Sequence, residues 1–258
     1  MRGEALVVVT TSHKARPSVV AVARSRAIEW GLEFVERDGR PISDIVGPSV
    51  VALTFSNDDM HIATMDGPLR FHLGTAYIRM QSLGRGEADP MIRAGEIRSG
   101  DRILDTTFGL GRDARVAAKA VGSAGIVDAM ESGLALFRLA QIGLDAAPLE
   151  DGHARIAVRH GDSISFLSAC ADGAYDVVLI DPMFEQPKAS DAGFARLRHV
   201  ADQQPLSQTW VHEARRVARR WVVLKAGRSE DWFADEGLTW VRSNSNAGWY
   251  RAPGGWPF

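Results

Sequence analysis

The sequence predicts an α/β protein in which a mostly parallel, helix-covered sheet follows a small α+β domain. Strand and helix patterns alternate from residue 76 onward, and the strands there are continuous apolar runs, as in sheets buried on both faces. The first 75 residues instead hold short strands, one helix and a hairpin signal. We therefore predict two domains, residues 1–75 and 76–258.

The small domain is predicted from short β-branched segments and one amphipathic pattern. Its helix is expected to begin at Pro17 and to end at Gly31. The apolar residues of that helix recur at helical spacing, at Val19, Val20, Ala23, Ala27 and Ile28. Strands are expected over 5–11, 32–37 and 50–55, followed by a hairpin over 60–73 that turns at Asp66-Gly67.

The large domain is expected to open with a helix, a glycine- and arginine-rich loop, and a second helix that starts near Asp89-Pro90. Its parallel strands are expected in DRILDTT, GIVDAME, ARIAVRHGD and YDVVLIDPM. The helices between them are expected in GRDARVAAKAVG, ALFRLAQIGLDAA and SISFLSAC. Closing strands are expected over 220–227, 238–244 and 248–253, the last two as an antiparallel hairpin.

Composition excludes several classes of protein. The chain has 258 residues and a formal net charge of −2, so no overall positive field favours nucleic acid, although a local basic face is compatible with it. Its one cysteine, Cys170, excludes a disulfide framework, and seven histidines without an HxxxH pair give no sign of a metal. No signal peptide and no apolar run of membrane-spanning length is found, so we expect a cytoplasmic protein that contacts no membrane.

The segment RILDTTFGLGRDA (102–114) places an acid and two glycines where a buried strand should turn into a helix. Ligands of open α/β sheets bind beyond the carboxyl ends of the strands, where Asp105 is expected. Gly109 and Gly111 lack a β-carbon, so the chain can turn tightly there and a ligand can touch the backbone. The loop predicts a ligand site, and simple strand-to-helix packing is the alternative.

Two further acids end the next two predicted strands. Glu131 comes twenty positions after Gly111, where an acid can accept both hydroxyls of a ribose. Asp162 follows the third strand and is placed to accept the exocyclic amine of an adenine. Either acid could instead cap the following helix. Three acids at three successive strand ends nevertheless favour a nucleoside ligand.

S-adenosylmethionine matches this set better than the other nucleotide cofactors do. A nicotinamide dinucleotide requires G-x-G-x-x-G, but Ala114 replaces the third glycine and Asp113 would bring negative charge to the pyrophosphate. A P-loop is absent because no G-K-[ST] follows. The sulfonium, amino-acid end, ribose and adenine of S-adenosylmethionine suit Asp105, Glu131 and Asp162.

A second informative stretch, YDVVLIDPMF (175–184), ends a predicted strand with Asp181, Pro182, Met183 and Phe184. Pro182 stiffens the turn, while Asp181 and nearby carbonyls are expected to accept the N–H groups of an amine. Phe184 offers a flat face on which a base can stack. These groups suit methylation of an exocyclic nitrogen, and an ordinary turn with Phe184 in the core is the alternative.

The stretch DTTFGLGRDA resembles the first motif of class I methyltransferases in the variant D-x-T-x-G-L-G-R-D-A, with Thr107 where glycine is more common. Paired with DPMF, it is similar to the bacterial methyltransferases that act on the guanine N2 amine of small-subunit ribosomal RNA. The segment FHLGTAYIRMQSLGRGEADPMI resembles the region before the domain in that family and in its uncharacterised Firmicutes relatives. The N-terminal segment is more similar to those relatives. The resemblance extends to about residue 190 and implies a Rossmann-like sheet and S-adenosylmethionine.

Carried over by residue, the resemblance implies two sets of site residues. The cofactor set is Asp105, Thr107, Gly109, Gly111, Arg112, Asp113, Glu131 and Asp162. The methyl-acceptor set is Asp181, Pro182, Met183 and Phe184. The sequence departs from the family after DPMF, where Glu185 comes first and Lys188 is separated from Ser190. An acid in that place would repel a phosphate.

An RNA substrate also requires basic residues on the surface. We expect Arg79, Arg85 and Lys188 to contact it, and a helix over EARRVARR (213–220) presents four arginines on one broad side. The alternative for that helix is a solvated face. Three other functions remain open: methylation of a protein amide or a small amine, S-adenosylmethionine binding without catalysis, and, more distantly, a dehydrogenase.

Overall fold

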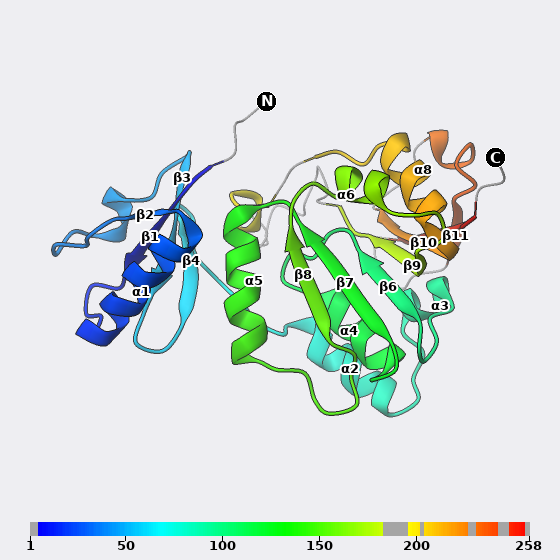
Figure 1. Ribbon diagram of the computed structural model, residues 1–258, viewed down its shortest axis with the longest axis horizontal. Coiled ribbons are helices and arrows are strands. Elements are labelled where there is room, and N and C mark those ends of the chain that lie inside the picture. Colours follow the sequence, from blue (N-terminus) through cyan, green and yellow to red (C-terminus); the bar gives the residue numbers. More distant parts are fainter. Residues whose placement is uncertain (1–4, 183–195, 202–203, 227–230, 242–247, 256–258) are drawn as a thin grey trace. The chain divides into compact units, whose positions relative to one another are not determined.

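The computed structural model describes residues 5–182, 196–201, 204–226, 231–241 and 248–255 (Figure 1). They divide into two compact units. Unit 1 contains the chain up to His72, together with Gly133–Ala146 and residues 196–201. Unit 2 contains Leu73–Ser132, the chain from Ala147 to Pro182, and the described residues after 203. A single boundary near residue 75 stays a prediction.

Unit 1 is built on a five-stranded sheet of order β2-β1-β3-β4-β5. β1 runs parallel to both β2 and β3, whereas β4 is antiparallel to β3 and β5. Its elements are β1 (Leu6–Thr11), α1 (Pro17–Trp30), β2 (Glu33–Phe34), η1 (Ile42–Asp44), β3 (Val50–Phe55), β4 (Met60–Thr64), β5 (Gly67–Arg70) and α5 (Leu134–Ala146). α5 contacts β3 and β4, so a helix from the middle of the chain packs on this sheet.

Helix α1 begins and ends as its sequence predicts. Pro17 opens it, and Gly31 closes it with a positive φ of 65° that glycine adopts without strain. The buried face is formed by Ala23, Ala27 and Trp30. Ile28, which we assigned to that face, is 82% exposed because it lies on the opposite side of the helix from Trp30.

Two details of unit 1 differ from the prediction. Thr64 pairs with Gly67 across the β4–β5 hairpin, so the turn residues are Met65 and Asp66 rather than Asp66 and Gly67. β2 is also shorter than expected, because only two of its residues pair with β1.

Unit 2 is built on a seven-stranded sheet of order β11-β12-β10-β9-β6-β7-β8. The five strands from β10 to β8 are parallel, and β12 is antiparallel to β10 and β11. The strands are β6 (Arg102–Asp105), β7 (Ile126–Glu131), β8 (Ile156–His160), β9 (Tyr175–Ile180), β10 (Ala218–Ala226), β11 (Thr239–Val241) and β12 (Gly248–Pro253). The mostly parallel sheet and its antiparallel C-terminal hairpin are as predicted.

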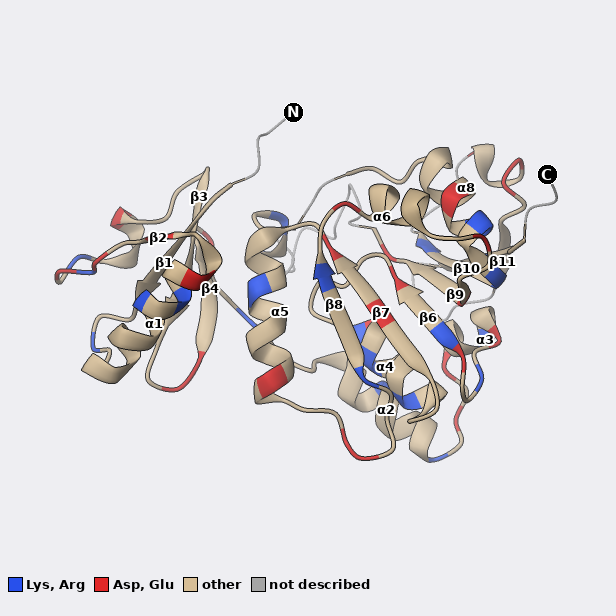
Figure 2. Cartoon of the chain, viewed as in Figure 1, with Lys and Arg blue, Asp and Glu red and all other residues tan. Residues whose placement is uncertain are grey.

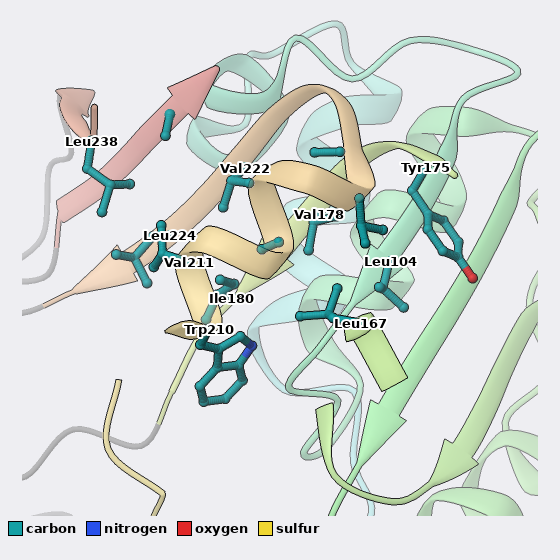
Figure 3. Packing of buried hydrophobic residues seen from close by; sticks show 14 of the residues in the cluster. Leu104, Leu167, Tyr175, Val178, Ile180, Trp210, Val211, Val222, Leu224 and Leu238 are labelled. Carbon is teal, nitrogen blue, oxygen red and sulfur yellow. The ribbon is translucent and has the colours of Figure 1, made fainter. Parts of the chain in front are cut away.

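Helices cover both faces of this sheet. They are α2 (Thr75–Gly84), α3 (Pro90–Gly95), α4 (Arg112–Val121), α6 (Ser163–Ala169) and α8 (Gln208–Val217), with the short η2 (Asp231–Phe233). α6 and α8 pack over Val178, Val222 and the rest of a large apolar cluster (Figure 3). Gly95 of α3 lies against Val177 and Val223, whose side chains point to the other face because side chains alternate along a strand.

Candidate active site

Three acids lie at the carboxyl ends of parallel strands in unit 2. Asp105 ends β6 and Glu131 ends β7, while Asp181 directly follows β9. β6 lies between the other two strands, so the three strand ends share one edge of the sheet. Asp105 and Glu131 are only 2% and 6% exposed. A buried carboxylate requires hydrogen bonds or a cation, and the loop after β6 supplies the hydrogen bonds.

The loop after β6 is held by the acids on either side of it. One carboxylate oxygen of Asp105 accepts hydrogen bonds from the backbone N–H (2.9 Å) and the hydroxyl (3.3 Å) of Thr107. The N–H of Gly109 donates to Glu131 Oε2 at 2.8 Å. Glu131 therefore holds the backbone of Gly109, and its predicted contact with the ribose of a cofactor stays a prediction.

The two glycines of the loop differ in their surroundings. Both have positive φ, 55° at Gly109 and 70° at Gly111. A β-carbon at Gly109 would have only the Thr107 carbonyl oxygen near it, at 3.9 Å, whereas one at Gly111 would collide with the ring of Phe108. Gly109 therefore leaves open space beside its α-carbon that a ligand can occupy, whereas packing at the start of α4 requires glycine at position 111.

Asp162 takes the helix-capping alternative. Its side chain is exposed and accepts a hydrogen bond from the N–H of Ser165 at 2.7 Å, at the first turn of α6. The contact stabilises the start of that helix. An interaction of Asp162 with an adenine stays a prediction.

Asp181 is hydrogen-bonded to the loop after β6 and to β10. Its backbone N–H donates to Thr107 Oγ1 at 2.8 Å, and its Oδ2 accepts from Lys225 Nζ at 2.5 Å. Lys225 was not among the predicted site residues, because RWVVLKAG was interpreted only as a closing strand. A single lysine near the end of an apolar parallel strand was the available signal.

The charges at this edge alter one another's protonation. Burial raises the pKa of Asp105 to about 7, the N–H of Thr107 opposes this, and the carboxylates of Asp113 and Asp181 add to it. Burial also raises the pKa of Asp181 to about 6, against the charge of Lys225. Burial works against the charge of Lys225, but Asp181 and Asp113 outweigh it and raise the lysine pKa. Lys225 therefore stays charged while Asp105 titrates near neutral pH.

Arg79, expected to contact RNA, lies between two carboxylates of unit 2. Its Nε and Nη2 donate to Asp89 at 2.7 and 3.0 Å, and its Nη1 pairs with Asp113 on the first turn of α4. Asp89 also caps α3, as the sequence predicts. Arg79 thus connects α2 to the helix that follows the glycine loop, and its role in RNA binding stays a prediction.

Of the other predicted site residues, the structure describes Arg112, Arg85 and Pro182. Arg112 is the first residue of α4 and is half-buried, and exposed Arg85 pairs with Glu87 at 2.7 Å. Pro182 is buried beside Asp181. Met183, Phe184 and Lys188 lie outside the described residues, and their roles stay predictions.

The predicted basic helix over EARRVARR is wrong. α8 ends at Val217, because from Ala218 the backbone is extended and pairs with β9. The four arginines bind groups of their own unit, with Arg215 at the Pro253 carbonyl, Arg216 at the Leu167 and Cys170 carbonyls, Arg219 at Asp176 and Arg220 at Asp101. Figure 2 accordingly shows basic and acidic positions interspersed rather than gathered on one helix.

Comparisons with known proteins identify the family. A family model described as "Putative SAM-dependent methyltransferase" matches residues 48–246. The chain belongs to this family. It is an S-adenosylmethionine-dependent methyltransferase, and the open space beside Gly109 with the buried carboxyl group of Asp105 fits a cofactor that carries positive charge.

Individual relatives agree with the predicted resemblance. "Uncharacterized protein YpiP" of Bacillus subtilis (strain 168) is 32% identical over 224 residues, which cover 84% of this chain and 87% of that protein. Ribosomal RNA small subunit methyltransferase J of Laribacter hongkongensis (strain HLHK9) is 31% identical over 164 residues, covering 60% of this chain and 58% of that enzyme. The structure of the SAM-dependent methyltransferase NGO1261 from Neisseria gonorrhoeae has a TM-score of 0.64 at 19% identity over 95% of both chains, so the Rossmann-like fold is confirmed.

Two features are absent from the residues that the structure describes. No group of three or more histidine, cysteine, aspartate or glutamate side chains there is arranged to hold a metal ion. No helix among the same residues has the length and apolar character that crossing a membrane requires.

Proposed function

We propose that this methyltransferase modifies an exocyclic amine of a base in RNA, with guanine N2 of ribosomal RNA as the first candidate. One observation carries the proposal: Asp181 and Pro182 follow β9 directly beside the cofactor loop, to which Asp181 is attached through Thr107. A carboxylate in that position can accept an N–H of an amine held against the cofactor. The relatives named as small-subunit ribosomal RNA methyltransferases support an RNA substrate.

The roles of the site residues are part of this proposal. When bound, S-adenosylmethionine supplies a methyl group on an already activated sulfonium, so the chain has mainly to align the acceptor. Asp105 and Asp113 stabilise the cofactor's positive charge, and Glu131 holds its ribose. Asp181 orients the amine by accepting one N–H and receives the proton that the amine loses. Its pKa of about 6 suits a proton acceptor working near neutral pH.

The RNA proposal is tested by comparing modified nucleosides. Ribosomal RNA from cells with and without the gene is digested and its nucleosides are measured by mass spectrometry. We expect one N2-methylguanosine to be lost in the deletion strain, restored by the wild-type gene and not by Asp181→Ala. Identical nucleosides in both strains would refute the proposal, and calorimetry with S-adenosylhomocysteine would show that the purified protein still binds its cofactor product.

A smaller acceptor is the second candidate, because the arginines expected to form a basic face bind groups within unit 2. Arg79 is likewise engaged by Asp89 and Asp113. A protein amide or a free amine needs no such face, and Asp181 can orient either. Radioactive methyl transfer to the protein or small-molecule fraction of the deletion strain, with none to RNA, would favour this candidate.

A further inference from the structure

Lys225 stands beside Asp181 because of strand register. β10 and β9 are parallel neighbours, and Leu224 pairs with Ile180. The next residue on each strand is therefore Lys225 and Asp181, and the lysine Nζ lies 2.5 Å from Asp181 Oδ2. The side chains of this ion pair are 29% and 26% exposed, so water screens it less than it screens a surface pair.

We propose that Lys225 is a positioning residue for Asp181: its ammonium holds one carboxylate oxygen and leaves the other to accept an N–H of the methyl acceptor. The inference rests on the proposed role of Asp181. The Asp181 backbone is already fixed by its hydrogen bond to Thr107. Among the residues that the structure describes, Oδ1 makes no hydrogen bond, so fixing Oδ2 orients the remaining oxygen.

The surrounding charges explain why a cation is needed in this place. Asp113 from α4 acts on Asp181 as a like charge, and Asp181 in turn raises the pKa of Asp105 from β6. Arg79 from α2 reaches Asp181 only through longer-range attraction, because its contacts are with Asp89 and Asp113. On the remaining side, the ring of Trp249 from β12 lies 5.4 Å from Lys225 Nζ and stabilises the ammonium. Without Lys225, the Asp181 carboxylate would be repelled by Asp113 with no cation in contact among these residues.

The choice of lysine also agrees with this role. The chain has 4 lysines and 26 arginines, so it uses arginine for most of its positive charges and lysine at position 225 is an exception. An ammonium is a point charge that can hold one carboxylate oxygen, whereas a guanidinium fork tends to bind both oxygens at once. Arginine would thus compete with the acceptor for the second oxygen.

The pairing can be measured without any acceptor, by nuclear magnetic resonance of the full-length protein labelled with ¹⁵N-lysine. The four lysines give four ammonium signals, and loss of one signal in Lys225→Met assigns it. We expect Lys225 to titrate at higher pH than the other three, and Asp181→Asn to remove the difference. If Lys225 titrates with the others in the wild-type protein, the pairing is refuted.

The positioning role is tested by the pH dependence of methyl transfer from labelled S-adenosylmethionine to small ribosomal subunits from gene-deleted cells. Removing the lysine charge raises the pKa of Asp181 further, so its accepting form is depleted on the acid side. We expect Lys225→Met to lower kcat/KM about 10- to 100-fold near pH 6.5 and much less near pH 9, since each pKa unit is worth about a factor of ten. Lys225→Arg should restore the pH profile without restoring the full rate.

Controls separate positioning from structural damage. Lys14→Met removes the same charge from an exposed loop of unit 1 and should leave the profile unchanged. Affinity for S-adenosylhomocysteine should stay within about twofold in Lys225→Met, because the lysine acts through Asp181. If Lys225→Met lowered kcat/KM equally at every pH, or lost its affinity for S-adenosylhomocysteine, the inference would be overturned. If the wild-type enzyme labels no RNA, the RNA proposal fails, while the ammonium titration still decides whether Lys225 holds Asp181.

Discussion

Two strand–loop–helix segments, β1–α1 of unit 1 and β6–α4 of unit 2, have the same local topology and different chemistry. Each strand lies between two parallel neighbours, β2 and β3 for β1, and β7 and β9 for β6. β1 ends in the buried hydroxyls of Thr10 and Thr11, whereas β6 ends in the buried carboxyl of Asp105. Neutral hydroxyls are easily satisfied within the protein, but an acid in the same position can stabilise a cationic ligand.

The loops after the two strands extend the contrast. In unit 1 the side chain of Asn57 accepts from the N–H of Arg16 at 2.9 Å and donates to the carbonyl of Lys14 at 3.0 Å. Both loops are thus bonded within their own units, but the loop after β6 is bonded to two acids and leaves open space beside the α-carbon of Gly109. The end of a parallel strand is a possible position for a ligand site, and the polar residues around that strand end determine whether a ligand can bind there.

The largest effect is expected at Asp181, which follows β9, the parallel neighbour of β6. Asp181→Ala removes the group that orients the amine, so methyl transfer should fall by about 100-fold or more. Binding of S-adenosylhomocysteine, measured by calorimetry, should be retained. Asp58→Ala, in an exposed turn of unit 1, is the matched control. Undiminished turnover in Asp181→Ala would exclude the proposed role.

Gly109 and Gly39 provide a comparison at equal backbone strain. Both have positive φ, 55° and 77°, and neither has an atom close to where a β-carbon would lie. Valine at either position should cost about 1–3 kcal/mol of stability, measured by thermal unfolding. Only Gly109→Val should also weaken S-adenosylhomocysteine binding, by about tenfold or more, because its side chain enters the ligand's space. Equal binding by both variants would contradict a ligand at this loop.

Asp105 should show a conflict between stability and cofactor binding. Its folded-state pKa of about 7 lies above the usual value, so the folded protein binds a proton more strongly than the unfolded chain, and stability falls as pH rises from about 4 to 7. Asp105→Asn should therefore increase the free energy of unfolding by about 1–3 kcal/mol near pH 8 and by a smaller amount near pH 5, while weakening S-adenosylmethionine binding. Denaturant unfolding at both pH values measures the free energy of unfolding. If Asp105→Asn were less stable than the wild-type protein near pH 8, the prediction would be wrong.

The smallest effect is expected in the loop after β1. Asn57→Ala removes two hydrogen bonds to exposed backbone and should lower the free energy of unfolding by about 1 kcal/mol. Cofactor affinity should not change, because this loop is bonded within unit 1. A measurable loss of S-adenosylhomocysteine affinity in this variant would show that the two segments are not functionally distinct.

The sequence predicted the elements better than the contacts between them. Local signals were sufficient for α1, where Pro17 and Gly31 mark the ends, and for β6, where an apolar run meets Asp105. The end of α8 was missed because Arg219 and Arg220 continue the helical spacing of charge, and only pairing with β9 extends the chain at Ala218.

The site was predicted in part for the same reason. Strand ends could be read from the sequence, so Asp105, Glu131 and Asp162 were predicted at three successive strand ends and Asp181 at the end of a further strand; of these, Asp162 caps α6. The partners of these residues could not be predicted from the sequence. The Asp181–Lys225 contact, for example, joins positions 44 residues apart and depends on which strands are neighbours in the sheet. The pairing of Arg79 with Asp113 likewise spans 34 residues.

Helix α5 has a consequence for dissecting the enzyme. The chain leaves unit 2 after Ser132, contributes α5 to unit 1, and returns at Ala147. Within unit 1, the ring of Phe71 lies so close to Gly143 of α5 that a β-carbon there would collide with it. A fragment that starts at residue 76 would keep α5 but lose Phe71 and the strands it covers. A cut at residue 75 would therefore divide unit 1 between the two fragments.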